Sequence, residues 1–272
     1  MKRTIRQIAR RGDPGRALAA LFAPRGSRDD LFGLYAFDAE LARIQHIVSE
    51  PALGAIRLQW WREAIERAAR GEPAGHPVAD AFGAAISRRS LSRTRIAALI
   101  DARGMETDRD IMPDLRALSA YLDDTESGLF ALAEEIVGEG RSASSEAVRA
   151  AGEAYGLTAL MRALPHKATK RRVDLPEDLL ARHGTSPEEV LAGEASDGLR
   201  ALLASLRTRA SDALKEANRH IAALDPRARE AFRPLALVEP YLAALESEDH
   251  DPLRHVVEIN PLYRIWRIAT WR

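Results

Sequence analysis

The stretch from residue 34 to residue 65 constrains the fold more than any other part of the sequence. Large apolar side chains recur there at steps of three and four residues on both sides of Pro51, which is the spacing of helices with one buried face. The sequence therefore predicts two helices that meet at a Ser49-Glu50-Pro51 break. The faces expected to be buried carry Leu34, Phe37, Leu41, Ile44 and Val48 in the first helix, and Ile56, Trp60 and Ile65 in the second.

The remaining sequence predicts an all-α protein. Alanine, leucine, arginine and glutamate dominate, and alternating β-branched residues are nearly absent. Asp13-Pro14, His76-Pro77, Ser92 and Ser196 are typical helix starts. We expect Ser27 to cap the helix that contains Tyr35. We also expect one long helix after Pro113 and another after Pro226, and we expect Pro165 to disrupt the helix in which it lies. No repeat or low-complexity linker divides the chain, so the sequence favours one domain spanning residues 1–272.

The composition excludes several classes of function. The 272 residues carry no formal net charge, which argues against nucleic-acid binding. The absence of cysteine excludes disulfides and thiolate metal sites. The basic amino terminus lacks the apolar core of a secretory signal, and no stretch has the length of a membrane-spanning helix. We therefore expect a cytoplasmic protein with at most peripheral contact with the inner membrane.

Four short motifs occur in an order that resembles the squalene/phytoene synthase family. They are LYAF at residues 34–37, WR at 61–62, LTALMR at 157–162 and LP at 175–176. The resemblance implies a helical bundle of the isoprenoid-synthase type with a central cavity. It also implies the family's chemistry, in which two prenyl diphosphates are joined head to head and aspartates hold magnesium on the diphosphate.

The aspartates that this chemistry requires are missing at both motifs. The positions that correspond to the family's first motif hold Ala42, Arg43 and His46, and those of the second hold Ala159, Ala163 and His166-Lys167. Such side chains do not suit a hard dication. The pattern predicts no catalytic residue, no metal ligand and no cofactor, and it resembles the branch that contains the mitochondrial complex I assembly factor 6 and its bacterial relatives. The alternative is an active prenyl diphosphate transferase with an atypical Mg²⁺ site.

Cationic side chains predict a different use for the cavity. Arginine and lysine bind phosphate directly, without a metal. We therefore expect an anionic ligand with an apolar tail, such as an isoprenoid diphosphate or a phospholipid. We also expect a protein of a respiratory complex as a partner. The predicted ligand-binding residues are Arg43, His46, Arg162, Lys167, Arg171 and Arg172, and the predicted cavity-lining residues are Tyr35, Phe37, Trp61 and Tyr155.

Two further segments have more than one interpretation. The acidic run at residues 123–126 is expected to form a solvated helix face rather than a metal site. The final segment, from Tyr263 to Arg272, interleaves aromatic and basic residues. It is expected to be a closing helix packed on the bundle, with attachment to a membrane surface as the alternative.

Overall fold

The computed structural model confirms the all-α prediction for the residues it describes, which are 2–48, 50–106, 112–138, 144–247 and 249–271. All regular elements in these ranges are helical. They are α1 (Lys2–Gly12), α2 (Pro14–Ala20), α3 (Arg25–Ile47), α4 (Pro51–Ala69), α5 (Pro77–Arg89), α6 (Arg93–Met105), α7 (Leu115–Leu122), the π-helical turn η1 (Asp123–Ser127), α8 (Gly128–Val137), α9 (Ser145–Thr169), α10 (Glu177–Arg182), α11 (Pro187–Ala192), α12 (Asp197–Ile221), α13 (Pro226–Arg229), the 3₁₀ segment η2 (Glu230–Leu237), α14 (Val238–Leu245) and α15 (Pro261–Thr270).

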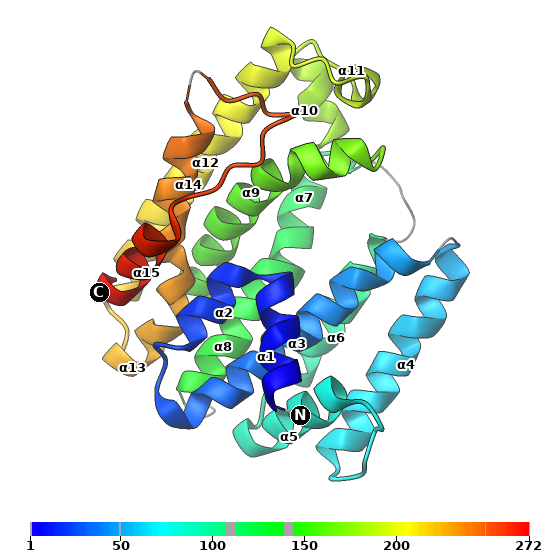
Figure 1. Cartoon of the computed structure of the whole chain (residues 1–272), viewed down its shortest axis with the longest axis vertical. Coiled ribbons are helices and arrows are strands. Elements are labelled where there is room, and N and C mark those ends of the chain that lie inside the picture. The colour runs from blue at the N-terminus through cyan, green and yellow to red at the C-terminus, as the bar shows by residue number, and fades with distance from the viewer. Residues whose placement is uncertain (1, 49, 107–111, 139–143, 248, 272) are drawn as a thin grey trace.

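The helices surround a continuous apolar core that extends from Ile5 to Ile268. Helix α9 packs along α12, α3 packs along α1, and α4 pairs with α5. In Figure 1, α4 and α15 lie at opposite edges of the molecule, with α3, α8 and α9 between them. This arrangement brings α2, α3, α6, α9 and η1 together around a group of buried polar residues that includes Arg16, Arg103 and Glu106.

Several predicted helix starts are confirmed by their capping geometry. The carboxylate of Asp13 accepts a hydrogen bond from the backbone N–H of Arg16, and Ser92 and Ser196 cap α6 and α12 in the same way. The expected cap at Ser27 is wrong. Helix α3 starts two residues earlier, and the Ser27 hydroxyl is buried and donates instead to the carbonyl of Ile136.

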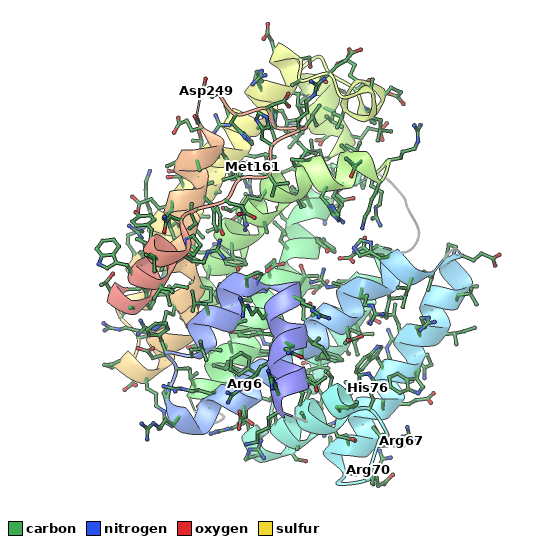
Figure 2. The ribbon with its side chains drawn as sticks, viewed as in Figure 1. Arg6, Arg67, Arg70, His76, Met161 and Asp249 are labelled. Carbon is green, nitrogen blue, oxygen red and sulfur yellow. The ribbon has the colours of Figure 1, made fainter. Side chains whose placement is uncertain are left out.

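The α3–α4 pair follows the predicted break at Pro51, and Ile65 is buried as predicted, but the prediction of burial is wrong for Ile56 and Trp60. Ile56 is 66% exposed and Trp60 is 39% exposed. The buried positions of this face are Leu58, Trp61 and Ile65. Trp61 packs edge-on against Phe37 and His76, with ring centroids 5.5 and 4.9 Å apart, and Figure 2 shows His76 beside α4. Helix α4 contacts α5, α6 and α3, and this packing leaves the side that carries Ile56 and Trp60 exposed.

The predicted helix after Pro113 is present, with a π-helical turn in its middle. At this turn α9 approaches closely. A Cβ atom on Gly152 would lie 2.6 Å from the Cα of Ser127, and one on Gly156 would lie 3.0 Å from Cγ of Glu126. The two glycines therefore allow α9 to contact the turn.

Two predicted proline effects differ from the structure. Helix α9 continues through the buried Pro165 to Thr169, so the expected disruption is wrong. The segment after Pro226 is not one helix but the succession of α13, η2 and α14, and Pro234 lies inside the 3₁₀ part. Proline removes one backbone donor in each case, and the surrounding packing decides whether the helix tolerates the loss.

Candidate functional site

A buried guanidinium group joins two carboxylates from different helices. Arg103, near the end of α6, donates from Nη2 to Asp38 at 2.7 Å, and from Nη1 to Glu106 at 2.5 Å and to the Tyr121 hydroxyl at 3.0 Å. Burial opposes the charge of Arg103, but Asp38 and Glu106 outweigh it and raise its pKa. Both carboxylates are therefore neutralised by a cation that belongs to the chain itself.

A second buried arginine lies among aromatic rings. Arg16 on α2 forms an ion pair with Glu126 of the π-helical turn at 2.8 Å, and its guanidinium lies 4.6 Å from the ring centroid of Tyr155. The Tyr155 hydroxyl donates to the carboxylate of Asp13 at 2.8 Å. Burial raises the pKa of the neighbouring Tyr35 to about 12. The cluster links α2, α3, η1 and α9, and its acids face cations or hydroxyl groups.

The acidic run at residues 123–126 was expected to be solvated, and this is wrong for Glu126. The π-helical turn directs its side chain toward Arg16, and the carboxylate is 15% exposed. Burial raises the pKa of Glu126, while Arg16 and Arg103 act in the opposite direction. The extra residue in the π-helical turn changes which side chains share a face, so ordinary helical spacing could not predict this orientation.

A third set of charges closes the space between the ends of α3 and α9. Asp174 forms ion pairs through both of its carboxylate oxygens, with Lys167 Nζ at 2.8 Å and with Arg172 Nη2 at 3.5 Å. Arg172 also donates to the side-chain oxygen of Gln45 at 2.6 Å, and Gln45 donates to Glu106. Gln45 thus connects this set to the cluster around Arg103.

A pocket of about 620 Å³ opens beside this set of charges. Burial and the positive charges of Lys170, Lys167 and Arg172 lower the pKa of His46, against the opposite effect of Glu106. The cations beside His46, rather than the shift itself, give the pocket positive charge that suits an anion. The residues that line the pocket are Gln45, His46, Val48, Lys170, Arg171, Arg172, Val173, Asp174, Pro187 and Leu191.

The structure brings some of the predicted ligand-binding residues together and separates others. His46, Arg171 and Arg172 line the pocket, and Lys167 contacts two of its lining residues. Arg43 is 61% exposed and pairs with Glu40. Arg162 lies elsewhere along α9, where its guanidinium stacks 3.5 Å from the ring centroid of Tyr241.

The predicted cavity-lining aromatic residues lie in two different environments. Phe37 and Trp61 are buried and pack edge-on against each other, and Phe37 stacks on Phe82 with a centroid distance of 4.6 Å. Tyr35 and Tyr155 lie instead beside the Arg16 guanidinium, with their ring centroids 5.9 and 4.6 Å from it. Their contribution to ligand binding stays a prediction.

The sequence analysis missed most members of the buried clusters, because their partners are far apart in the chain. Asp38 and Arg103 are 65 positions apart, and Asp13 and Tyr155 are 142 positions apart. Two local signals were available. Asp38 directly follows the LYAF motif, and Asp13 was recognised only as a helix cap.

Comparison with known proteins decides the family. The model of the squalene/phytoene synthase family matches residues 9–263. The chain belongs to this family. The human NADH dehydrogenase (ubiquinone) complex I assembly factor 6 is 28% identical over 270 residues, which cover 98% of this chain and 80% of the human protein. The bovine protein of that name is 30% identical over 90% of this chain and 74% of its own length. The presqualene diphosphate synthase of Rhodopseudomonas palustris is 30% identical over 63% of this chain and 62% of its own length.

Solved structures of family members confirm the isoprenoid-synthase type of helical bundle. A dehydrosqualene synthase crystallised with a ligand superposes with a TM-score of 0.82 at 15% identity, covering 99% of this chain and 95% of the other. The squalene synthase of Alicyclobacillus acidocaldarius gives a TM-score of 0.76 at 22% identity, covering 90% of this chain and 92% of the other.

The residues of this site do not fit the magnesium cluster that the family resemblance implies. Asp38 and Glu106 bind Arg103, and Asp174 faces both Lys167 and Arg172. Within the described ranges, no three histidine, aspartate or glutamate side chains are grouped so that they could hold a metal ion. In the same ranges, no helix combines the length and apolar character needed to cross a membrane.

Proposed function

We propose that this protein is a noncatalytic member of the squalene/phytoene synthase family that acts as an assembly factor for NADH dehydrogenase (complex I). The proposal is supported by the relatives named complex I assembly factor 6, which align with nearly the whole chain. We also propose that residues 1–272 act as one domain and work in peripheral contact with the inner membrane.

The observation that carries the noncatalytic part is the hydrogen bonding of Arg103 to both Asp38 and Glu106. Ionisation of a prenyl diphosphate develops negative charge on the leaving group, and the family's aspartates hold magnesium to neutralise it. Here the Arg103 guanidinium already binds the carboxylates of Asp38 and Glu106. A buried carboxylate that already binds arginine would have to lose that partner, at a cost of several kcal/mol, before it could bind a metal ion.

Two experiments test the proposal separately. The purified protein, incubated with farnesyl and geranylgeranyl diphosphates with and without Mg²⁺, is expected to release no diphosphate. Magnesium-dependent release with a coupled C30 or C40 product would establish the alternative, a head-to-head prenyltransferase. Deletion of the gene in its own host is expected to lower the amount of assembled complex I on native gels, and the parent gene should restore it. Unchanged complex I in the deletion strain would refute the assembly role.

A second candidate function is the binding of an anionic, apolar-tailed ligand in the 620 Å³ pocket. The specific observation is that Lys170, Arg171 and Arg172 line this pocket together with His46. Lys170 and Arg171 are exposed there and are placed to bind phosphate oxygens, while Val48 and Leu191 supply apolar contacts. An isoprenoid diphosphate and a phospholipid share this chemistry.

Calorimetric titration with farnesyl diphosphate and with a short-chain phosphatidylglycerol tests this candidate and distinguishes the two ligands. A double Lys170→Ala, Arg171→Ala variant is expected to weaken binding at least about tenfold, since two charge-assisted contacts are lost. Arg43→Ala is the matched control, because Arg43 is a similarly exposed cation on α3 that does not line the pocket. Equal affinity of the double variant and the parent would refute the site.

A further inference from the structure

A carboxylate of the protein lies inside the 620 Å³ pocket. Asp174 lines this pocket together with Lys170, Arg171 and Arg172. Its two oxygens pair with Lys167 Nζ at 2.8 Å and with Arg172 Nη2 at 3.5 Å. The Asp174 side chain is only 26% exposed, so water and salt screen its charge less than that of a surface acid. An anion that enters the pocket therefore meets a negative charge that belongs to the chain itself.

The two cations that bind Asp174 are also engaged elsewhere. Lys167 and Arg172 both donate to the side-chain oxygen of Gln45, at 3.4 and 2.6 Å. Arg172 Nη1 donates in addition to the backbone carbonyl of Glu106 at 3.0 Å. A ligand could use these two cations fully only by displacing Asp174, because the carboxylate already balances their charge.

The other two cations are free to bind a ligand. Lys170 and Arg171 are exposed, and their side chains form no hydrogen bond or ion pair with any other residue that the structure describes. Burial and the neighbouring cations lower the pKa of His46, so its imidazole adds no positive charge near pH 7. The pocket thus offers a ligand two unpaired positive charges.

Apolar side chains line the rest of the pocket. Val48 follows the end of α3, Val173 precedes Asp174, and Pro187 and Leu191 belong to α11. These side chains provide contacts for a length of acyl chain, which a free phosphate does not have.

We propose that Asp174 determines the ligand class of this pocket, so that it takes a phosphodiester with acyl chains, as in a phospholipid, and disfavours a prenyl diphosphate. A phosphodiester carries a single negative charge, which Lys170 and Arg171 can bind directly. A diphosphate carries more than one negative charge and would also need Lys167 and Arg172. Repulsion from the Asp174 carboxylate grows with the charge of the ligand. The inference rests on the anion-binding pocket proposed above and decides between its two ligand classes.

Calorimetric titration of the full chain tests the inference, with dihexanoyl phosphatidylglycerol below its micelle concentration and with farnesyl diphosphate, both without Mg²⁺. The parent is expected to bind the phosphodiester more tightly than the diphosphate. Asp174→Asn should tighten farnesyl diphosphate binding at least about tenfold and phosphatidylglycerol binding less than about threefold, because only the diphosphate gains the two released cations. Each ligand is compared with itself across variants, so the contribution of its apolar tail cancels.

A matched control separates the release of cations from a general change in charge. Glu188→Gln removes an exposed acid next to Pro187, and this acid forms no ion pair within the described ranges. It should change either affinity less than about twofold, since exposed charges are screened. A double Asp174→Asn, Lys167→Ala variant should lose most of the gain in diphosphate affinity, because Lys167 is one of the released cations. Circular dichroism and the melting temperature verify that each variant folds.

The possible outcomes distinguish this inference from the pocket itself. A parent that prefers farnesyl diphosphate, an Asp174→Asn variant with unchanged diphosphate affinity, or an equal gain in Glu188→Gln would overturn the role of Asp174 and leave the pocket standing. Binding of neither ligand by the parent would refute the pocket and the inference with it.

Discussion

Replacement of Arg103 by alanine is expected to destabilise the protein strongly. Arg103 is buried and binds Asp38, Glu106 and Tyr121. Its removal leaves two carboxylates in a largely buried site without their cation, and loss of one partner of a buried ion pair costs about 3–5 kcal/mol. We therefore expect the free energy of unfolding to fall by about 4 kcal/mol.

Urea denaturation followed by circular dichroism measures this loss. With a denaturant slope of about 3 kcal/mol per molar, the expected decrease corresponds to a midpoint shift of about 1.3 M. The matched control is Arg62→Ala. Arg62 on α4 pairs with Asp101, which lies on α6 as Arg103 does, but this pair is on the surface. Such surface pairs contribute about 0–1 kcal/mol, so the control should shift the midpoint by no more than about 0.3 M. An Arg103→Ala loss no larger than that of Arg62→Ala would refute the reasoning.

Three further predictions concern the packing and electrostatics of the site. Gly152→Ala should lower the free energy of unfolding by about 1–3 kcal/mol, measured by urea denaturation, because its Cβ would overlap the π-helical turn at Ser127; an unchanged midpoint would contradict this contact. Tyr155→Phe removes the hydrogen bond to Asp13 and should cost about 1–2 kcal/mol by the same assay; a smaller loss than that of a surface tyrosine, Tyr263→Phe, would contradict it. The pKa of His46 is lowered in the folded protein. Its imidazole therefore stays neutral at a pH somewhat below about 6.5, where the same imidazole in the unfolded chain binds a proton. Its contribution to stability is therefore present above that pH and decreases as the pH falls below it. Inorganic phosphate should raise the pKa of His46 in an NMR titration if the pocket binds anions, and an unchanged pKa would contradict this.

The all-α class and most helix boundaries could be predicted because their causes are local. Pro51 and Pro77 begin α4 and α5 as predicted, and Ser92 and Ser196 cap α6 and α12. A cap or a first-turn proline acts within four residues of its own position. The errors at Ser27 and Pro165 have the opposite cause, because contacts from distant helices outweighed the local preference.

The buried face of α4 and the orientation of α15 show the same limit in amphipathic helices. The apolar positions of α4 extend around more than one side, and packing against Phe37 of α3 accompanies the burial of Trp61 rather than Trp60. In α15, hydrogen bonds from Arg264 and Arg267 fix the orientation, so the apolar side chains between residues 262 and 266 face outward. Periodicity locates an apolar face, but the neighbours decide whether that face is buried.

The sequence by itself determined the helices, the family resemblance and the loss of the metal-binding acids, because residue identity and spacing carry these features directly. Only the tertiary structure decided which charges meet. Asp38 is brought to Arg103 by the packing of α3 and α6, and Glu126 is turned toward Arg16 by a π-helical turn that contacts Gly152. An ion pair depends on distances of a few ångströms between side chains. Those distances follow from the packing of whole helices, which no local pattern specifies.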